Sequence, residues 1–211
     1  MNNKTVINIS VPIKEGMPHY PTDPPAALEQ LYSLENGDAA NVSRVSICTH
    51  TGTHFDAPYH FFSDGKKADS YPADFFIGRA RVIDLSSGGD IKRGDILEKD
   101  IMPNDIVLLK TRNSEYMKTG SYYSNHVSVL YCAARFLAEK RIRALGFDYL
   151  TIERDAAFPS HRILLGAGIP IIEGLCLLGV KEGLYNMTAM FLNIESGDGA
   201  PISAILEQYV L

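Results

Sequence analysis

The segment 48–62, CTHTGTHFDAPYHFF, holds three of the six histidines of the chain together with one aspartate. These residues are His50, His54, Asp56 and His60, so the gaps between them are four, two and four positions. Two histidines and a carboxylate are a donor set that suits Zn²⁺, Mn²⁺ or Fe²⁺. The segment therefore predicts a metal site.

The same spacing could lie on a helix, because zincin proteases bind zinc with histidines four residues apart on one helical face. Here the intervening residues are Thr51, Gly52 and Thr53, and Pro58 follows closely. Two β-branched residues, a glycine and a proline disfavour a helix. We therefore expect this segment to be extended.

In an extended chain, side chains at even spacing point to the same face. His54 and Asp56 should then point together, and Gly52 permits a turn that brings His50 back toward them. His60 has the same parity but lies beyond a proline. The pattern predicts that four ligand-type side chains converge on one point.

A complete metal site needs further ligands from distant parts of the chain. Glu173 interrupts the apolar segment IPIIEGL (169–175), where an unpaired charge in a buried strand would cost several kcal/mol. It is the strongest distant candidate, and His161, at the start of an expected short helix, is a second. His126 precedes the longest expected helix and is interpreted as a capping or surface residue. The remaining distant candidates are His19, Asp148, Glu153 and Asp155.

Apolar periodicity places the secondary structure around these residues. Strands are expected at 5–13, 41–50, 78–87, 104–113, 145–152, 169–175 and 186–194, with a strand or helix at 201–207; 104–113 should be buried on both faces. Helices are expected at 128–145, with Ser128 as N-cap and Gly146 beyond the end, and at 161–168. The proline-rich segment 14–25 is expected to be a loop, and 26–34 is ambiguous. The pattern predicts one α/β domain over residues 1–211, a mixed β-sheet with packed helices.

Composition limits the classes of partner. Of 211 residues, 45% are apolar and 21% charged, and the net charge is −5, which argues against nucleic-acid or anionic-membrane partners. No apolar stretch is long enough to span a membrane, and the N-terminus lacks the features of a signal peptide. An odd number of cysteines, three, disfavours a disulfide framework. A cytoplasmic protein is expected.

The run HTGTHFDAPYH resembles the signature of the cyclase-like metal hydrolases, a family that includes bacterial kynurenine formamidase and isatin hydrolase. Further segments are similar to that family over most of the chain, namely INISVPIKEGMPHYPTDP, FFIGRARVIDLS, NDIVLLKTRN, ALGFDYLTIE, SHRILLGAGIPIIEGL and GDGAPISAIL. The resemblance implies a swivelling β/β/α fold and a homodimer or larger homo-oligomer.

The resemblance also implies roles for individual residues. His50, His54 and Asp56 match the ligands of a first metal ion. Asp56 can bridge to a second ion, for which His161 and Glu173 match the ligands, and His60 matches the proton donor and acceptor. One or two Zn²⁺ ions, or one Mn²⁺ ion, are the implied cofactors.

Tyr20 marks a departure from the formamidases, which carry a tryptophan in the same substrate loop. Tyr20 is expected to form one wall of the substrate site, with Phe61 or Phe62 as a possible second wall. The expected reaction is hydrolysis of a carbon–nitrogen bond in a small amide, first an N-formyl aromatic amine and next a cyclic amide or imide such as isatin. Two alternatives stay open: a non-haem iron oxygenase and a metal-binding module without catalysis.

Overall fold

The computed structural model describes residues 5–208. Its strands are β1 (Val6–Asn8), β2 (Ala27–Tyr32), β3 (Val42–Ser46), β4 (His54–Asp56), β5 (Gly78–Asp84), β6 (Ile106–Lys110), β7 (Ala144–Phe147), β8 (Ile171–Glu173), β9 (Gly183–Phe191) and β10 (Gly199–Gln208). The α-helices are α1 (Arg93–Ile96), α2 (Tyr131–Glu139) and α3 (Pro159–Gly166), and 3₁₀-helices span Leu34–Asn36, Pro58–His60, Ala68–Ser70 and Arg112–Lys118. No helix in the described part of the chain is long and apolar enough to cross a membrane.

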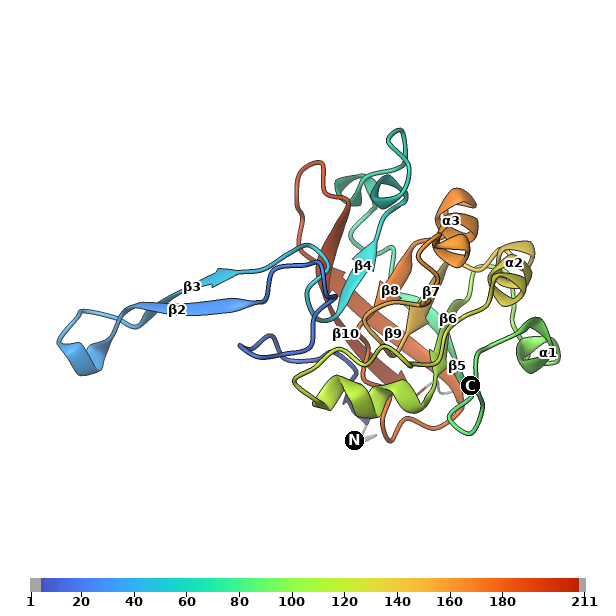
Figure 1. Cartoon of the computed structure of the whole chain (residues 1–211), viewed down its shortest axis with the longest axis horizontal. Helices are drawn as coiled ribbons and strands as arrows, with labels where there is room; N and C mark the ends of the chain where they lie inside the picture. The colour runs from blue at the N-terminus through green and yellow to red at the C-terminus, as the bar shows by residue number, and fades with distance from the viewer. Residues whose placement is uncertain (1–4, 209–211) are drawn as a thin grey trace.

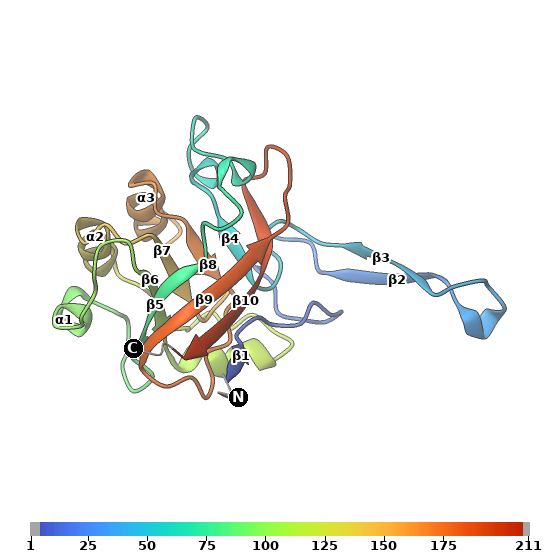
Figure 2. The same cartoon turned by 180° about the vertical axis from the view of Figure 1, so that it is seen from behind.

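Seven strands close into a mixed barrel in the order β10, β4, β8, β7, β6, β5, β9, because β9 pairs back with β10 (Figures 1 and 2). The β5–β6, β6–β7 and β7–β8 pairs are parallel, and the remaining pairs of the barrel are antiparallel. β1 pairs with the second half of β10. The expected mixed sheet is confirmed.

The barrel wall separates two apolar cores. In β6, Ile106 and Leu108 belong to the cluster inside the barrel, whereas Val107 and Leu109 belong to the cluster shared with α2 and α3. A strand that is covered on both faces has a continuous apolar sequence. The prediction that the strand within 104–113 is buried on both faces is therefore confirmed for β6. The helices pack on the outer face of the parallel strands.

The long helix is shorter than predicted. The helix α2 covers 131–139 instead of 128–145, and its N-cap is Leu130, not Ser128. The chain turns at Arg141, whose φ is +54°, an uncommon left-handed conformation for a residue with a Cβ. Gly146 lies inside β7, where a Cβ would stand 2.3 Å from Leu108 Cδ2. It therefore allows close packing within the barrel and does not end a helix.

In three further segments the structure either resolves an ambiguous assignment or differs from the expected strand. The ambiguous segment 26–34 contributes β2, and the segment 201–207 is part of the strand β10. The strand expected at 41–50 ends at Ser46, so His50 lies in the following turn. β2 and β3 form a hairpin, called the β2–β3 arm, that extends away from the barrel in both views (Figures 1 and 2).

Candidate metal centre

The pairing of β4 with β8 sets which side chains meet. His54 lies opposite Glu173, and Phe55 lies opposite Ile172. Phe55 and Ile172 belong to the core inside the barrel. Because successive residues of a strand face opposite sides, His54, Asp56 and Glu173 point to the outer face, beside α3. The alternation predicted for residues 54 and 56 is confirmed.

A tight turn before β4 brings in His50. Gly52 and Gly174 both have φ of +68°, and a Cβ on Gly174 would lie 1.9 Å from the Gly52 carbonyl oxygen. Only glycine fits this approach of the two backbones. His50 Nδ1 reaches to 2.8 Å from Asp56 Oδ1. The turn proposed at Gly52 is therefore present, and it returns His50 to Asp56.

The first turn of α3 supplies His161. Its Nδ1 lies 2.7 Å from Glu153 Oε1, which also accepts the His161 backbone N–H at 2.9 Å. Its Nε2 lies 3.2 Å from Glu173 Oε1 and 3.8 Å from Asp56 Oδ2. Glu153 thus orients the ring so that Nε2 faces the other site residues, an arrangement that is common around metal-ligating histidines.

The five predicted metal ligands lie together, and we call them the metal cluster: His50, His54, Asp56, His161 and Glu173. They form two candidate metal sites that share Asp56, because donor atoms of His50, His54 and Asp56, and those of Asp56, His161 and Glu173, lie within 4.8 Å of one another. His54 Nε2 is 3.3 Å from Asp56 Oδ1 and 3.6 Å from Glu173 Oε2.

The state of His54 is a test of whether a cation fits here. Its Nδ1 lies 3.1 Å from the Gly52 carbonyl oxygen, so Nδ1 carries a proton, and in the neutral form of the ring Nε2 offers a lone pair. This Nε2 is buried without a hydrogen-bond partner. An unpaired buried acceptor beside carboxylate oxygens suits a metal ion, as does the imidazole and carboxylate donor set.

Charge in the metal cluster is balanced between buried groups. Burial lowers the pKa of each histidine, but the carboxylates outweigh this effect and raise the pKa of His50 to about 10, of His54 to about 9 and of His161 to about 10. The carboxylates are Asp56 and Asp198 for His50, Asp56 and Glu173 for His54, and Glu153, Glu173 and Asp56 for His161. Buried carboxylates need nearby positive charge, which imidazolium groups or a divalent cation can provide.

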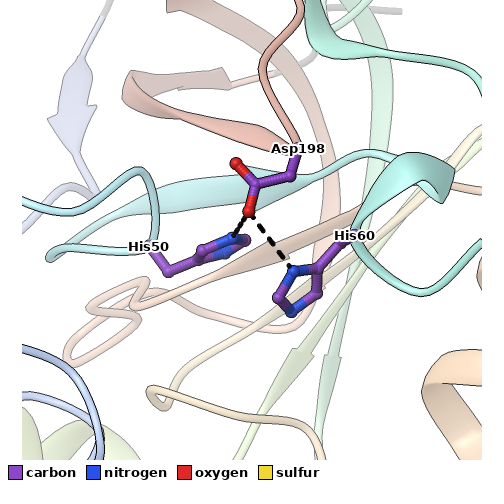
Figure 3. A group of neighbouring side chains, drawn as sticks. All are labelled: His50, His60 and Asp198. Carbon is purple, nitrogen blue, oxygen red and sulfur yellow. Dashed lines mark hydrogen bonds and ion pairs between the residues drawn. The ribbon is translucent and has the colours of Figure 1, made fainter. Parts of the chain in front are cut away.

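His60 lies at the rim of the cluster, at the end of the 3₁₀-helix that begins at Pro58. Its ring centroid is 4.0 Å from that of His50. Asp198 contacts both rings from one side, because its Oδ2 is 3.0 Å from His50 Nε2 and 3.6 Å from His60 Nδ1 (Figure 3). These hydrogen-bonding contacts with His50 and His60 hold the pKa of Asp198 well below its ordinary value.

Asp198 was missed as a participant in the site, and Glu153 was a candidate that was not singled out. Glu153 was one of several distant carboxylates, and nothing in its neighbourhood in the sequence relates it to His161. Asp198 stands between two glycines just before the final strand, which could have marked it as a constrained turn residue. Its position beside His50 depends on the pairing of β10 with β4, which sequence periodicity does not define.

A cavity of about 220 Å³ opens onto the metal cluster. Its other walls include Tyr20, Phe61, Leu150 and Phe158, and His60 also lines it. The Phe61 ring stacks on the His161 ring with centroids 5.1 Å apart. Phe62, the other residue proposed for a wall, packs against the apolar core instead. Tyr20, in the proline-rich segment 14–25, lines the cavity, and its contact with a substrate stays a prediction.

His126 is neither a helix cap nor a surface residue, because it is fully buried. It stands in a group of aromatic rings that we call the tyrosine cluster: Tyr116, Tyr122, Tyr123 and Tyr149. Its Nδ1 lies 3.1 Å from the Tyr123 carbonyl oxygen, and its Nε2 has no partner. The Tyr122 ring is 5.8 Å from that of Tyr20, so this cluster supports the cavity wall from behind.

The chain is similar to known proteins along almost its whole length. The family model described as "Putative cyclase" matches residues 7–154. A kynurenine formamidase from Bacillus mycoides is 32% identical over 98% of this chain and 99% of the relative. A solved structure described as a potential metal-dependent hydrolase with cyclase activity is 36% identical, with a TM-score of 0.86 over 99% of this chain and 100% of the other. Isatin hydrolase A from Labrenzia aggregata, solved with benzyl benzoate, shares the fold at 24% identity, with a TM-score of 0.83 over 97% and 94% of the two chains.

Proposed function

This chain belongs to the Cyclase family of metal-dependent hydrolases, and we propose that it is an arylformamidase. It would cleave the carbon–nitrogen bond of an N-formyl aromatic amine to give the amine and formate. The observation that carries the proposal is the metal cluster, with an unpaired His54 Nε2, at the base of a cavity with aromatic walls. The kynurenine formamidase relative supports the choice of substrate.

The metal cluster would hold one or two Zn²⁺ ions, with Mn²⁺ as the alternative. His50, His54 and Asp56 are proposed as ligands of the first ion, and Asp56, His161 and Glu173 as ligands of the second. When bound, such an ion supplies a Lewis acid that polarises a carbonyl and lowers the pKa of water to about 7. The buried carboxylates and the orientation of His161 by Glu153 keep the donor atoms in place for it.

His60 is proposed as the group that moves protons. It lines the cavity, and its Nδ1 faces Asp198, so its Nε2 is the nitrogen available to a substrate. From this position it can give a proton to the leaving nitrogen as the carbon–nitrogen bond breaks. Its partly exposed ring, 31% accessible, allows exchange of that proton with solvent.

The cavity walls suit a flat aromatic group. The Tyr20, Phe61 and Phe158 side chains line it, and aromatic rings are favourable partners for stacked or edge-on rings. A cyclic amide such as isatin is the second candidate, because the same walls would accept a fused ring and the fold is shared with isatin hydrolases. Tyr20 is the residue proposed to contact either substrate.

The deciding experiment combines metal analysis of the purified protein with assays of N-formylkynurenine and isatin, with and without oxygen. We expect one or two equivalents of zinc or manganese and formate release that is independent of oxygen. Hydrolysis of isatin alone would favour the second candidate. Oxygen-dependent turnover would indicate an iron oxygenase, and metal without turnover would indicate a binding module; either result would contradict the proposal.

An assembly of two or more copies belongs to the same proposal. Its support is the β2–β3 arm, in which every residue of both strands is exposed, including Leu28, Leu31 and Tyr32. A two-stranded hairpin is marginally stable alone in water, and exposed apolar surface often marks an interface. Light scattering should give the mass of a dimer or larger species, and a monomer at micromolar concentration would contradict this.

Three finer expectations also stay proposals. Superposition of an experimental structure on swivelling β/β/α proteins would test that classification. Fractionation of cells would test the cytoplasmic location. The small-molecule amide remains the proposed partner, without nucleic acid or membrane, and a binding assay with DNA and anionic vesicles at physiological salt should detect neither.

A further inference from the structure

Asp198 contacts both histidines at the edge of the site. Its Oδ2 lies 3.0 Å from His50 Nε2 and 3.6 Å from His60 Nδ1, and its Oδ1 accepts the Thr49 hydroxyl at 3.0 Å (Figure 3). The first and third distances are those of hydrogen bonds, and the second is longer than a hydrogen bond. One carboxylate therefore joins a metal-cluster histidine to the histidine proposed to move protons.

The backbone holds this carboxylate in place. Asp198 precedes β10, and its carbonyl oxygen accepts the Ala57 N–H at 2.9 Å. Gly199 pairs with Asp56 in the β4–β10 ladder, and a Cβ on Gly199 would stand 3.0 Å from the His50 ring. Because β4 also carries His54 and Asp56, the β4–β10 pairing sets the position of Asp198 relative to the metal cluster.

For His50 the contact decides which nitrogen keeps its proton when a cation binds. Nδ1 is 2.8 Å from Asp56 Oδ1, on the side of the metal cluster, and Nε2 faces Asp198. A carboxylate accepts hydrogen bonds but does not donate them. In the metal-free protein both nitrogens face carboxylates. A cation at the metal cluster would replace the proton on Nδ1, while Asp198 retains the proton on Nε2. Carboxylates play this role beside many metal-ligating histidines.

For His60 the same carboxylate favours a proton on Nδ1, whereas for His50 it favours a proton on Nε2. Nδ1 is the atom that faces Asp198, so the proton is favoured on Nδ1 and the lone pair on Nε2. His60 lines the cavity, where an unprotonated Nε2 can take a proton and then return it. Contacts of catalytic groups are often long before a ligand binds, which fits the distance of 3.6 Å.

We propose that Asp198 is a positioning residue that selects the protonated nitrogen of both His50 and His60. It makes Nδ1 of His50 available to the metal cluster and Nε2 of His60 available to the cavity. The part that concerns turnover rests on the proposed function, whereas the part that concerns the imidazoles and metal affinity does not.

The test compares wild-type protein with Asp198→Asn and Asp198→Glu. Asparagine keeps the shape but removes the negative charge, so the oxygen that faces both histidines becomes a weaker acceptor than the carboxylate Oδ2. We expect the affinity of the metal-free protein for Zn²⁺, measured by competition with a chelator, to fall by about 10- to 100-fold. We expect kcat at saturating zinc to fall by a similar factor with little change in KM, and glutamate to restore part of both.

Nitrogen NMR of labelled histidines in the zinc-loaded proteins provides the direct observation. Wild-type protein should show the proton of His50 on Nε2 and that of His60 on Nδ1, and Asp198→Asn should lose this preference at His60. Asp69→Asn is the matched control. Asp69 accepts at 2.8 Å the N–H of Ser196, which lies in the same loop as Asp198, but Asp69 contacts no histidine in the described structure. It should leave zinc affinity and imidazole signals unchanged.

Two results would overturn the proposal. One is an Asp198→Asn protein with wild-type zinc affinity and unchanged protonation of both rings. The other is a zinc ion held directly by His50, His60 and Asp198, whose donor atoms also lie within 4.8 Å of one another, because Asp198 would then be a ligand. These measurements need no substrate, so they remain decisive if the wild-type protein fails to hydrolyse N-formylkynurenine.

Discussion

The metal cluster includes His54, and the tyrosine cluster surrounds His126; these two buried histidines make the same local hydrogen bond. His54 and His126 both direct Nδ1 to a backbone carbonyl oxygen 3.1 Å away. In both rings Nε2 is buried and makes no hydrogen bond. The difference lies in the surroundings, since carboxylate oxygens stand 3.3 and 3.6 Å from His54 Nε2, whereas aromatic rings enclose His126.

The electrostatic consequence is opposite in the two regions. Burial lowers the pKa of both histidines, but Asp56 and Glu173 reverse this for His54 and raise its pKa to about 9. Burial dominates at His126 and lowers its pKa to about 4. An unpaired buried imidazole nitrogen is therefore insufficient evidence for a cation site. The adjacent negative charge makes the difference, because it is what a divalent ion would neutralise.

The difference between His54 and His126 is tested most strongly by removing each imidazole ring in turn. We expect His54→Ala to weaken zinc binding by more than about 100-fold, since loss of a ligand should exceed the 10- to 100-fold effect of an outer partner. His126→Ala should keep its zinc, although the cavity it creates should lower stability. Metal content after dialysis and thermal unfolding measure the two effects. Equal loss of zinc from both variants would remove the distinction.

His60→Ala separates holding a metal from moving a proton. Turnover should fall by about 10²–10⁴, the usual contribution of general acid–base catalysis, while zinc content stays near that of the wild type. Steady-state kinetics and metal analysis on the same preparation provide the measurement. If His60→Ala lost as much zinc as His54→Ala, His60 would act primarily as a ligand.

Tyr20 lies between the tyrosine cluster and the cavity, because its ring contacts Tyr122 and it lines the cavity. An aromatic contact contributes about 0.5–1.5 kcal/mol beyond burial, so Tyr20→Ala should lower kcat/KM for an aromatic amide by roughly tenfold with the metal retained. Tyr20→Phe keeps the ring and is the control, and Tyr20→Trp should shift preference toward N-formylkynurenine. An unchanged kcat/KM in Tyr20→Ala would place Tyr20 outside the substrate site.

The smallest effect expected at neutral pH is on the free energy of unfolding of the metal-free protein. The pKa of His126 is depressed in the folded state, so its contribution is present above about pH 6.5, the value in the unfolded chain, and is lost as pH falls toward about 4. The pKa of His54 is raised, so its contribution is complete below about pH 6.5 and is lost as pH rises through about 9.

His126→Phe should therefore reduce the loss of stability on the acid side and leave the alkaline side unchanged. Urea unfolding of metal-free wild-type and variant protein between pH 4.5 and 9.5 would measure both sides, with His54 intact in each. A variant that lost stability with pH as steeply as the wild type on the acid side would show that His126 is already charged in the folded protein.

Local patterns accounted for the parts of the fold and site that depend on neighbouring residues. Strand alternation predicted that His54 and Asp56 share a face, and the glycine at position 52 predicted the turn that returns His50. A charge within an apolar run singled out Glu173, which pairs directly with His54. Each inference used only the period of a strand or the conformational freedom of one residue, which a short segment contains.

Tertiary structure decided what depends on the partner of each segment. Asp198 stands beside His50 and His60 because β10 pairs with β4, and Glu153 orients His161 because the start of α3 packs on the segment after β7. His126 was interpreted as a cap or surface residue, yet its fully buried side chain lies against Tyr149. Periodicity defines the face to which a side chain points, but the residue that it meets there depends on strand register and helix packing between separate segments of the chain.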